Sequence, residues 1–113
     1  MPGFHIDGGT HFVSFITGPS HNILGLKLVD DKRESPLIVA KEGKYASNTF
    51  DEAKLTIAVQ TGVDRALKDS SRKIYVSEIV YMKDDSVRYD AYEICAGLIV
   101  ERYLSNPDDY ETN

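Results

Sequence analysis

The sequence has few of the residues that cross-link a small chain, and no segment that would carry it across a membrane. It contains 113 residues with no tryptophan and a single cysteine, Cys95. A lone cysteine excludes a disulfide-stapled secreted scaffold and a cysteine-rich zinc site. No apolar run approaches the roughly 20 residues of a transmembrane helix. Residues 1–7 lack the basic and apolar parts of a secretory signal, so we expect a cytoplasmic protein.

Basic residues are in the minority. The chain has 13 Lys and Arg against 18 Asp and Glu, and its formal net charge is -5. Binding to nucleic-acid phosphates needs a basic face, so the composition disfavours a nucleic-acid partner. Three of the acids lie in residues 105–113, where no basic residue accompanies them. We expect this acidic tail to be disordered and residues 1–104 to form a single domain.

Four segments have the composition of β-strands. Residues 11–17, 23–29, 36–40 and 73–82 are rich in β-branched, aromatic or alternating apolar side chains. A turn over residues 18–22 would join the first two segments into an antiparallel hairpin. The segment Asp7-Gly8-Gly9-Thr10 breaks the chain early, and it matches neither a Walker loop nor a dinucleotide-binding fingerprint.

Two further segments predict helices. Residues 50–69 place apolar side chains at three- and four-residue spacing, after a possible capping box formed by Thr49 and Glu52. Residues 91–104 follow Asp90, which resembles an N-cap. This second helix is apolar around most of its circumference. We therefore expect it to be buried on more than one side, either between layers or against another copy of the chain.

The predicted order is β-β-β-α-β-α. We expect an α+β two-layer sandwich in which a four-stranded sheet carries both helices on one face. If the third and fourth strands are parallel, their connection through the first helix is expected to be right-handed.

Residues 52–104 resemble part of domain IV of elongation factor G, whose fold is shared with the second domain of a small-subunit ribosomal protein. The family's first helix has the form a-v-x-x-G-v-x-x-A-L, and residues 58–67 read AVQTGVDRAL. The strand at 75–82, the turn at 83–86 and the helix around 93–100 follow in the family's order. The resemblance implies the β-β-β-α-β-α topology. It carries no function, because the family's RNA-approaching tip loops have no counterpart here.

Catalytic candidates are sparse. His5, His11 and His21 all lie in the first 21 residues, but a strand separates His11 from His21, so we expect no metal site. No cofactor motif is present, and no cofactor is expected. The catalytic candidates are His11 and His21 as general bases and Ser20 as a nucleophile, although adjacent residues such as Ser20 and His21 rarely form a nucleophile–base pair. Cys95 lies in an apolar helix, where a buried thiol is inert.

Tyrosines are distributed unevenly along the chain, with most of them towards its C-terminal end. The chain has seven tyrosines, and five of them lie in its last third with two arginines close by in sequence. Tyrosine and arginine are enriched in binding hot spots, because they combine a large apolar body with a polar tip. The predicted ligand or partner surface consists of Tyr75, Tyr81, Arg88, Tyr89, Tyr92, Arg102 and Tyr103.

Three functions fit these features. We expect a binding or regulatory module that self-associates through its apolar C-terminal helix and uses the Tyr/Arg surface to bind a protein or small ligand. One alternative is a small enzyme with a His general base at a protomer boundary, which requires a concave site around the imidazole. The other is an acidic inhibitor of a nucleic-acid-binding protein, which requires a contiguous acidic face.

Overall fold

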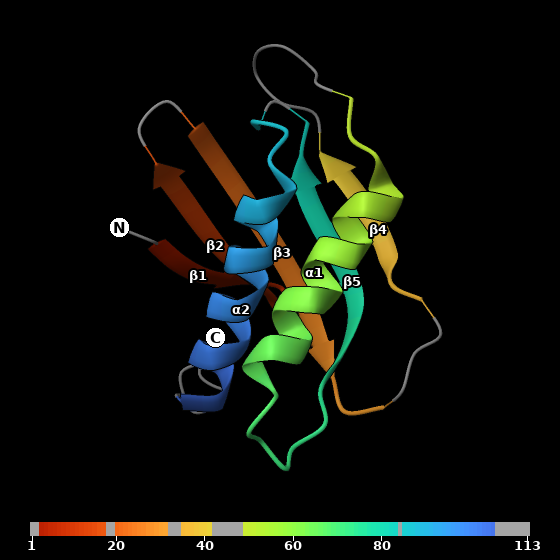
Figure 1. The fold of residues 1–113 in the computed structure, drawn as a ribbon, viewed down its shortest axis with the longest axis vertical. Helices are drawn as coiled ribbons and strands as arrows, with labels where there is room; N and C mark the ends of the chain where they lie inside the picture. Colours follow the sequence, from red (N-terminus) through yellow and green to blue (C-terminus); the bar gives the residue numbers. More distant parts are fainter. Residues whose placement is uncertain (1–2, 18–19, 32–34, 42–48, 84, 106–113) are drawn as a thin grey trace.

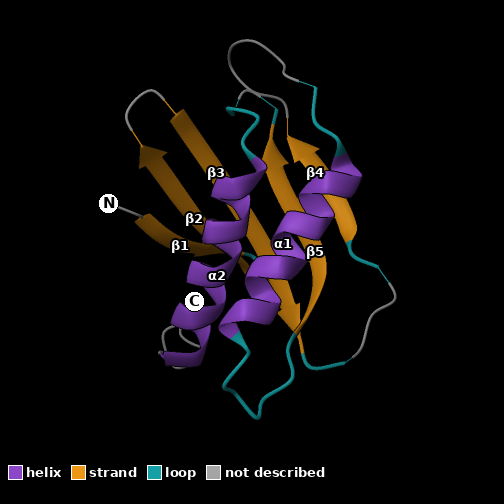
Figure 2. Ribbon diagram, in the orientation of Figure 1, coloured by secondary structure: helices purple, strands orange, loops and turns teal. Residues whose placement is uncertain are grey.

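A computed structural model describes residues 3–17, 20–31, 35–41, 49–83 and 85–105 of the chain. It shows an α+β fold in which two helices cover one face of a mixed sheet (Figures 1 and 2). The sheet has five strands in the order β1-β2-β3-β5-β4. The elements along the chain are β1 (Gly3–Asp7), β2 (Thr10–Thr17), β3 (Ser20–Val29), β4 (Leu37–Lys41), α1 (Glu52–Ala66), β5 (Tyr75–Met82) and α2 (Tyr89–Ser105).

The strand β1 corrects the expectation of a four-stranded sheet. It pairs antiparallel with β2, and the pairing runs to the turn, where Asp7 lies opposite Thr10. The turn residues Gly8 and Gly9 have φ angles of 57° and 83°. Two successive positive φ angles define the tight hairpin turn that suits the twist of antiparallel strands. The Gly-Gly pair that interrupts the sequence is therefore the turn of a hairpin.

The hairpin of β2 and β3 is tighter than expected. Its pairing continues to Thr17 opposite Ser20, so Ser20, His21 and Asn22 belong to a strand and not to the expected turn of residues 18–22. Positions 18 and 19 lie outside the described residues. The ladder of hydrogen bonds therefore places His21 and Asn22 side by side on β3 with their side chains on opposite faces of the sheet.

The connection from β4 to β5 departs from the usual hand. The two strands are parallel. Seen from the side of the helices, the chain rises along β4, descends along α1 in front of the sheet and rises again along β5, to the left of β4 (Figure 1). This path is left-handed, so the expected right-handed connection is wrong. Since β5 lies between β3 and β4 and α1 must cover the apolar face, these two requirements determine the hand.

Both helices begin at positions other than those expected. The N-cap of α1 is Asp51, whose Oδ1 accepts hydrogen bonds from the amides of Ala53 (3.0 Å) and Lys54 (3.2 Å), so the capping box with Thr49 is not formed. This start leaves Phe50 outside the helix, where its ring packs 4.7 Å from that of Tyr81.

The N-cap expected at Asp90 is also wrong. The helix α2 begins at Tyr89, and Asp90 lies within its first turn. The Arg88 carbonyl already accepts a hydrogen bond from the Ala91 amide at 3.1 Å, so helical bonding starts before Asp90. The Asp90 carboxylate instead forms an ion pair with the Arg88 guanidinium at 2.7 Å.

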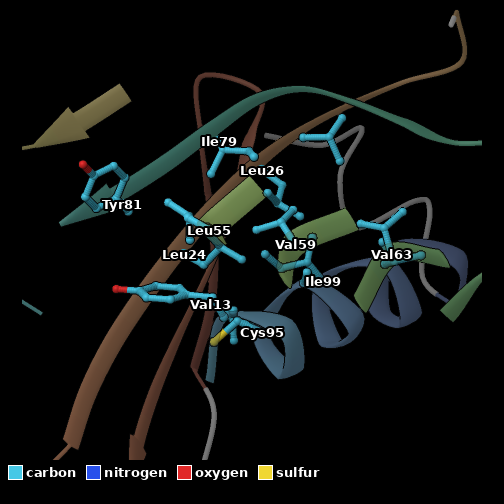
Figure 3. Packing of buried hydrophobic residues seen from close by; sticks show 14 residues of the cluster. Val13, Leu24, Leu26, Leu55, Val59, Val63, Ile79, Tyr81, Cys95 and Ile99 are labelled. Carbon is cyan, nitrogen blue, oxygen red and sulfur yellow. The ribbon is translucent and has the colours of Figure 1, made fainter. Parts of the chain in front are cut away.

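The hydrophobic core fills the space between the sheet and the helix pair (Figure 3). The helices pack closely where Gly62 of α1 faces the backbone of α2, since a Cβ at this position would lie 2.2 Å from the Glu93 carbonyl oxygen. Fourteen buried residues form the core cluster: Val13, Leu24, Leu26, Leu55, Val59, Val63, Val76, Ile79, Tyr81, Tyr92, Cys95, Ala96, Ile99 and Val100.

The helix α2 has one buried face. Its buried residues include Tyr92, Cys95 and Ile99, whereas Ile94 is 45% exposed and Leu98 is only partly buried. Of the two expected arrangements, α2 between layers is not what the described residues show, and burial of α2 against another copy of the chain stays a prediction. Neither described helix combines the length and apolar character that a membrane span requires. The expected disordered tail lies almost entirely outside the described residues, which end at Ser105.

Candidate functional site

The structure separates the two histidines that are candidates for a general base. His11 pairs with Leu26 and is buried, whereas His21 pairs with Ile16 and its side chain is 53% exposed. The two histidines are thus about five positions apart along the hairpin, roughly 17 Å, and lie on opposite faces of the sheet. The side chain of Ser20 lies outside the described part of the structure. Among the described residues, no three His, Cys, Asp or Glu groups gather closely enough to hold a metal ion.

His11 lies beneath the C-terminal end of α2. Its imidazole contacts the Tyr103 ring edge-on, with 5.3 Å between the ring centroids. Burial disfavours the charged imidazolium and lowers the pKa of His11. Cys95 is fully buried, and burial raises the pKa of its thiol to about 12, so the thiolate required of a nucleophile is disfavoured. Both groups have the environment of packed core side chains.

Three of the seven residues of the expected Tyr/Arg surface use their hydroxyl groups in hydrogen bonds within the chain. Tyr81 is 4% exposed and donates to Glu52 at 3.1 Å, and burial, assisted by this bond, raises its pKa to about 12. Tyr92 is fully buried and its pKa is raised, mainly by burial. The Tyr89 hydroxyl accepts a hydrogen bond from the Asp51 amide at 2.9 Å. A partner would find little of Tyr81 or Tyr92 to contact.

Of the other four residues, Arg102 and Tyr103 lie together at the C-terminal end of α2, whereas Arg88 lies just before α2 and Tyr75 lies on β5. The guanidinium carbon of Arg72 lies 4.9 Å from the centroid of the Tyr103 ring. That of Arg102 lies 4.6 Å from the centroid of the Phe4 ring. Arg88 pairs with Asp90, and Tyr75 lies on β5 opposite Val29. The structure therefore does not bring the seven residues together on one surface.

Sequence reasoning missed a buried polar cluster around Asp85. The Asp85 residue is 1% exposed, and its Oδ2 accepts hydrogen bonds from the Ile23 amide (2.6 Å) and the Tyr92 hydroxyl (3.0 Å). Its Oδ1 lies 4.0 Å from His21 Nδ1. Asn22, also fully buried, donates to the Ser86 carbonyl at 2.7 Å. Asp85 thus satisfies an amide of β3 beyond the end of β5 and joins the sheet to α2.

A second feature that sequence reasoning missed is the groove on the outer face of the helix pair. Two hollows lie in this groove, one of about 340 Å³ and one of about 180 Å³. Glu93 lines both, and it forms a 2.7 Å ion pair with Arg65 across the groove. The first hollow is lined by Lys54, Ile57, Ala58, Thr61, Tyr89, Asp90 and Glu93. The second is lined by Gly62, Arg65, Ala66, Glu93, Ile94, Gly97, Leu98 and Glu101.

This outer helix face, defined by the residues of the two hollows, combines exposed apolar side chains with divided charge. Ile57 is 66% exposed and Ile94 is 45% exposed. The basic residues of the face, Lys54 and Arg65, belong to α1, and its acidic residues, Asp90, Glu93 and Glu101, belong to α2. Ile57 falls outside the apolar stripe that faces the core, which is the signal in the sequence that could have identified it.

Comparisons with known proteins assign no family to the chain: no family model matches it, and no curated protein matches it.

Proposed function

We propose that this chain is a small protein-binding module that acts through its outer helix face. The observation that carries the proposal is the exposure of Ile57 and Ile94 beside two hollows that charged residues surround. Apolar side chains with a charged rim are typical of protein interaction sites, because binding removes the apolar surface from water while the rim remains solvated.

The proposal differs from the expected Tyr/Arg surface in its location. Tyrosines such as Tyr81 and Tyr92 stabilise the core and its polar contacts, whereas the exposed apolar area of the helices lies around Ile57 and Ile94. Self-association through the apolar C-terminal helix remains compatible with this surface, since Ile94 and Leu98 of α2 line the second hollow.

Photo-crosslinking tests the proposal. A photo-reactive phenylalanine analogue at position 57 is expected to form discrete adducts with a protein partner in the source cells, because this position is exposed beside the first hollow of the proposed surface. The matched control is position 37, since Leu37 is 64% exposed but lies on the edge strand β4. Equal adduct formation at the two positions, or none at position 57, would contradict a binding role for the helix face.

The enzyme alternative has one observation in its favour, the 4.0 Å separation of His21 from the buried Asp85. A carboxylate beside an imidazole can orient a general base. However, Asp85 already accepts two hydrogen bonds that hold the fold together, and the two described hollows lie on the helix side of the molecule. Asn22 faces the core, so its neighbour His21 points to the other side of the sheet.

The inhibitor alternative requires a contiguous acidic face. In the described residues, acidic side chains pair with basic ones at Lys27–Glu78, Arg65–Glu93, Arg72–Asp30 and Arg88–Asp90. Interleaved charges of this kind disfavour the inhibitor interpretation. The resemblance to domain IV of elongation factor G remains a proposal about ancestry, and the β-β-β-α-β-α order of β2 through α2 supports it.

A further inference from the structure

We infer that a second copy of this chain occupies the outer helix face, with α1 of each copy lying over α2 of the other. This inference rests on the proposed function, because it names the partner of the same surface. Its basis is the division of charge between the helices, which makes the face complementary to itself in one orientation.

The symmetry of a dimer limits how two such faces can meet. In a twofold face-to-face dimer the axis lies in the plane of contact, and each residue pair occurs twice. The helices α1 and α2 run side by side in the same general direction (Figure 1). A twofold axis perpendicular to the helices would place α1 against the partner's α1 and α2 against the partner's α2. An axis parallel to the helices would place α1 against the partner's α2.

The charges favour the axis along the helices. An axis across them would oppose the acidic residues of α2, Asp90, Glu93 and Glu101, with the same three residues of the partner. Like charges that face one another across an interface are costly. An axis along the helices instead brings Lys54 and Arg65 of α1 over the acidic side of the partner's α2.

The positions of the charges along the helix axes, referred to here as their heights, also agree with this arrangement. Lys54 and Asp90 line the same hollow, at the N-terminal ends of their helices, and Arg65 and Glu101 both line the other hollow. Rotation about an axis along the helices preserves these heights. Lys54 of one copy therefore meets Asp90 of the second copy, and Arg65 meets Glu101. Both pairs occur twice, and Ile57 and Ile94 are covered between them.

Sedimentation equilibrium of the full chain tests the inference. The wild-type chain is expected to sediment as a dimer, and Ile57→Asp is expected to weaken the dimer at least about tenfold, because it buries a charge in the contact. Leu37→Asp is the control, since Leu37 is as exposed as Ile57 but lies on β4, and it should leave the dimer unchanged. Circular dichroism establishes that each variant folds.

Charge reversal tests the orientation separately. Lys54→Glu and Asp90→Lys should each weaken self-association by about tenfold, because each creates two like-charge pairs in the dimer. An equimolar mixture of the two variants should restore a dimer, since every reversed charge then faces its opposite. Failure of the mixture to associate would overturn the arrangement of α1 over the partner's α2.

The outcomes distinguish this inference from the proposed function. A wild-type chain that remains monomeric at the highest concentration at which it stays soluble would overturn self-association. If position 57 still crosslinked to a different protein in that case, the helix face would be a binding surface with another occupant. If the crosslinks at position 57 were also absent, both proposals would fall.

Discussion

Replacement of Asp85 by alanine is expected to lower the free energy of unfolding by about 3 kcal/mol. The change leaves the Ile23 amide and the Tyr92 hydroxyl without the carboxylate that accepts their hydrogen bonds. Each buried donor that loses its acceptor costs about 1–3 kcal/mol. Both groups lie where the sheet meets α2, and Tyr92 is fully buried. Urea denaturation followed by circular dichroism measures the loss.

Asp30→Ala is the matched control for this prediction. Its carboxylate lies 3.8 Å from Arg72, and its side chain is 77% exposed. An exposed ion pair contributes about 0–1 kcal/mol, so this variant should unfold close to the wild-type midpoint. Equal destabilisation by the two substitutions would contradict the structural role given to Asp85.

The substitution Gly62→Ala is expected to have the second large effect. We predict that it lowers the free energy of unfolding by about 2 kcal/mol. The new Cβ would lie 2.2 Å from the Glu93 carbonyl oxygen and 3.1 Å from the Ala96 Cβ. Both neighbours belong to α2, and a backbone carbonyl cannot rotate away as a long side chain does. Separating the helices to make room is an overpacking effect of about 1–3 kcal/mol. Thermal unfolding by calorimetry would detect it.

Gly97→Ala provides a control of the opposite expected sign. Its nearest neighbour, the Gly62 carbonyl oxygen, would lie 3.6 Å from the added Cβ, an ordinary contact. Alanine is favoured over glycine in a helix by about 1 kcal/mol, so stability should stay equal or rise. Destabilisation by Gly97→Ala equal to that of Gly62→Ala would show that loss of glycine, and not the approach of the helices at Gly62, is responsible.

Much of the fold was predictable because local patterns and tertiary packing agree. Leu55, Val59 and Val63 repeat at helical spacing in the sequence, and the same three residues contribute to the core. The alternation of Leu24 and Leu26 likewise indicates the buried face of β3. In such segments the requirement to bury one face and the intrinsic preference of the chain lead to the same structure.

The remaining features depend on contacts between distant residues. β1 is a five-residue edge strand, and its pairing with β2 defines it more than its own composition does. Asp85 follows Lys83 and Asp84 in the sequence, in a polar stretch where an acid would ordinarily be solvated. Only the meeting of β3, β5 and α2 buries it. The tyrosines were misleading because proximity in sequence on β5 and α2 does not place their side chains on one surface.

Ile57 illustrates why the outer helix face was not predicted from the sequence. Ile57 falls outside the apolar stripe of α1 that Leu55, Ala58 and Val59 belong to, which indicates a surface position in the sequence but not what lies beside it. Only the position of α2 shows that Ile57 borders a hollow. The division of charge between α1 and α2 is visible for the same reason, since it depends on which helix surfaces lie next to one another.

In the proposed dimer, a second copy of the chain covers the outer helix face. Methyl NMR with a soluble paramagnetic relaxation agent tests it most directly, because the agent broadens methyl signals that water can reach. In the single chain Ile57 and Leu37 are equally accessible, with exposed fractions of 66% and 64%. We predict strong broadening at Leu37 and markedly weaker broadening at Ile57. Equal broadening of the two side chains would contradict the claim.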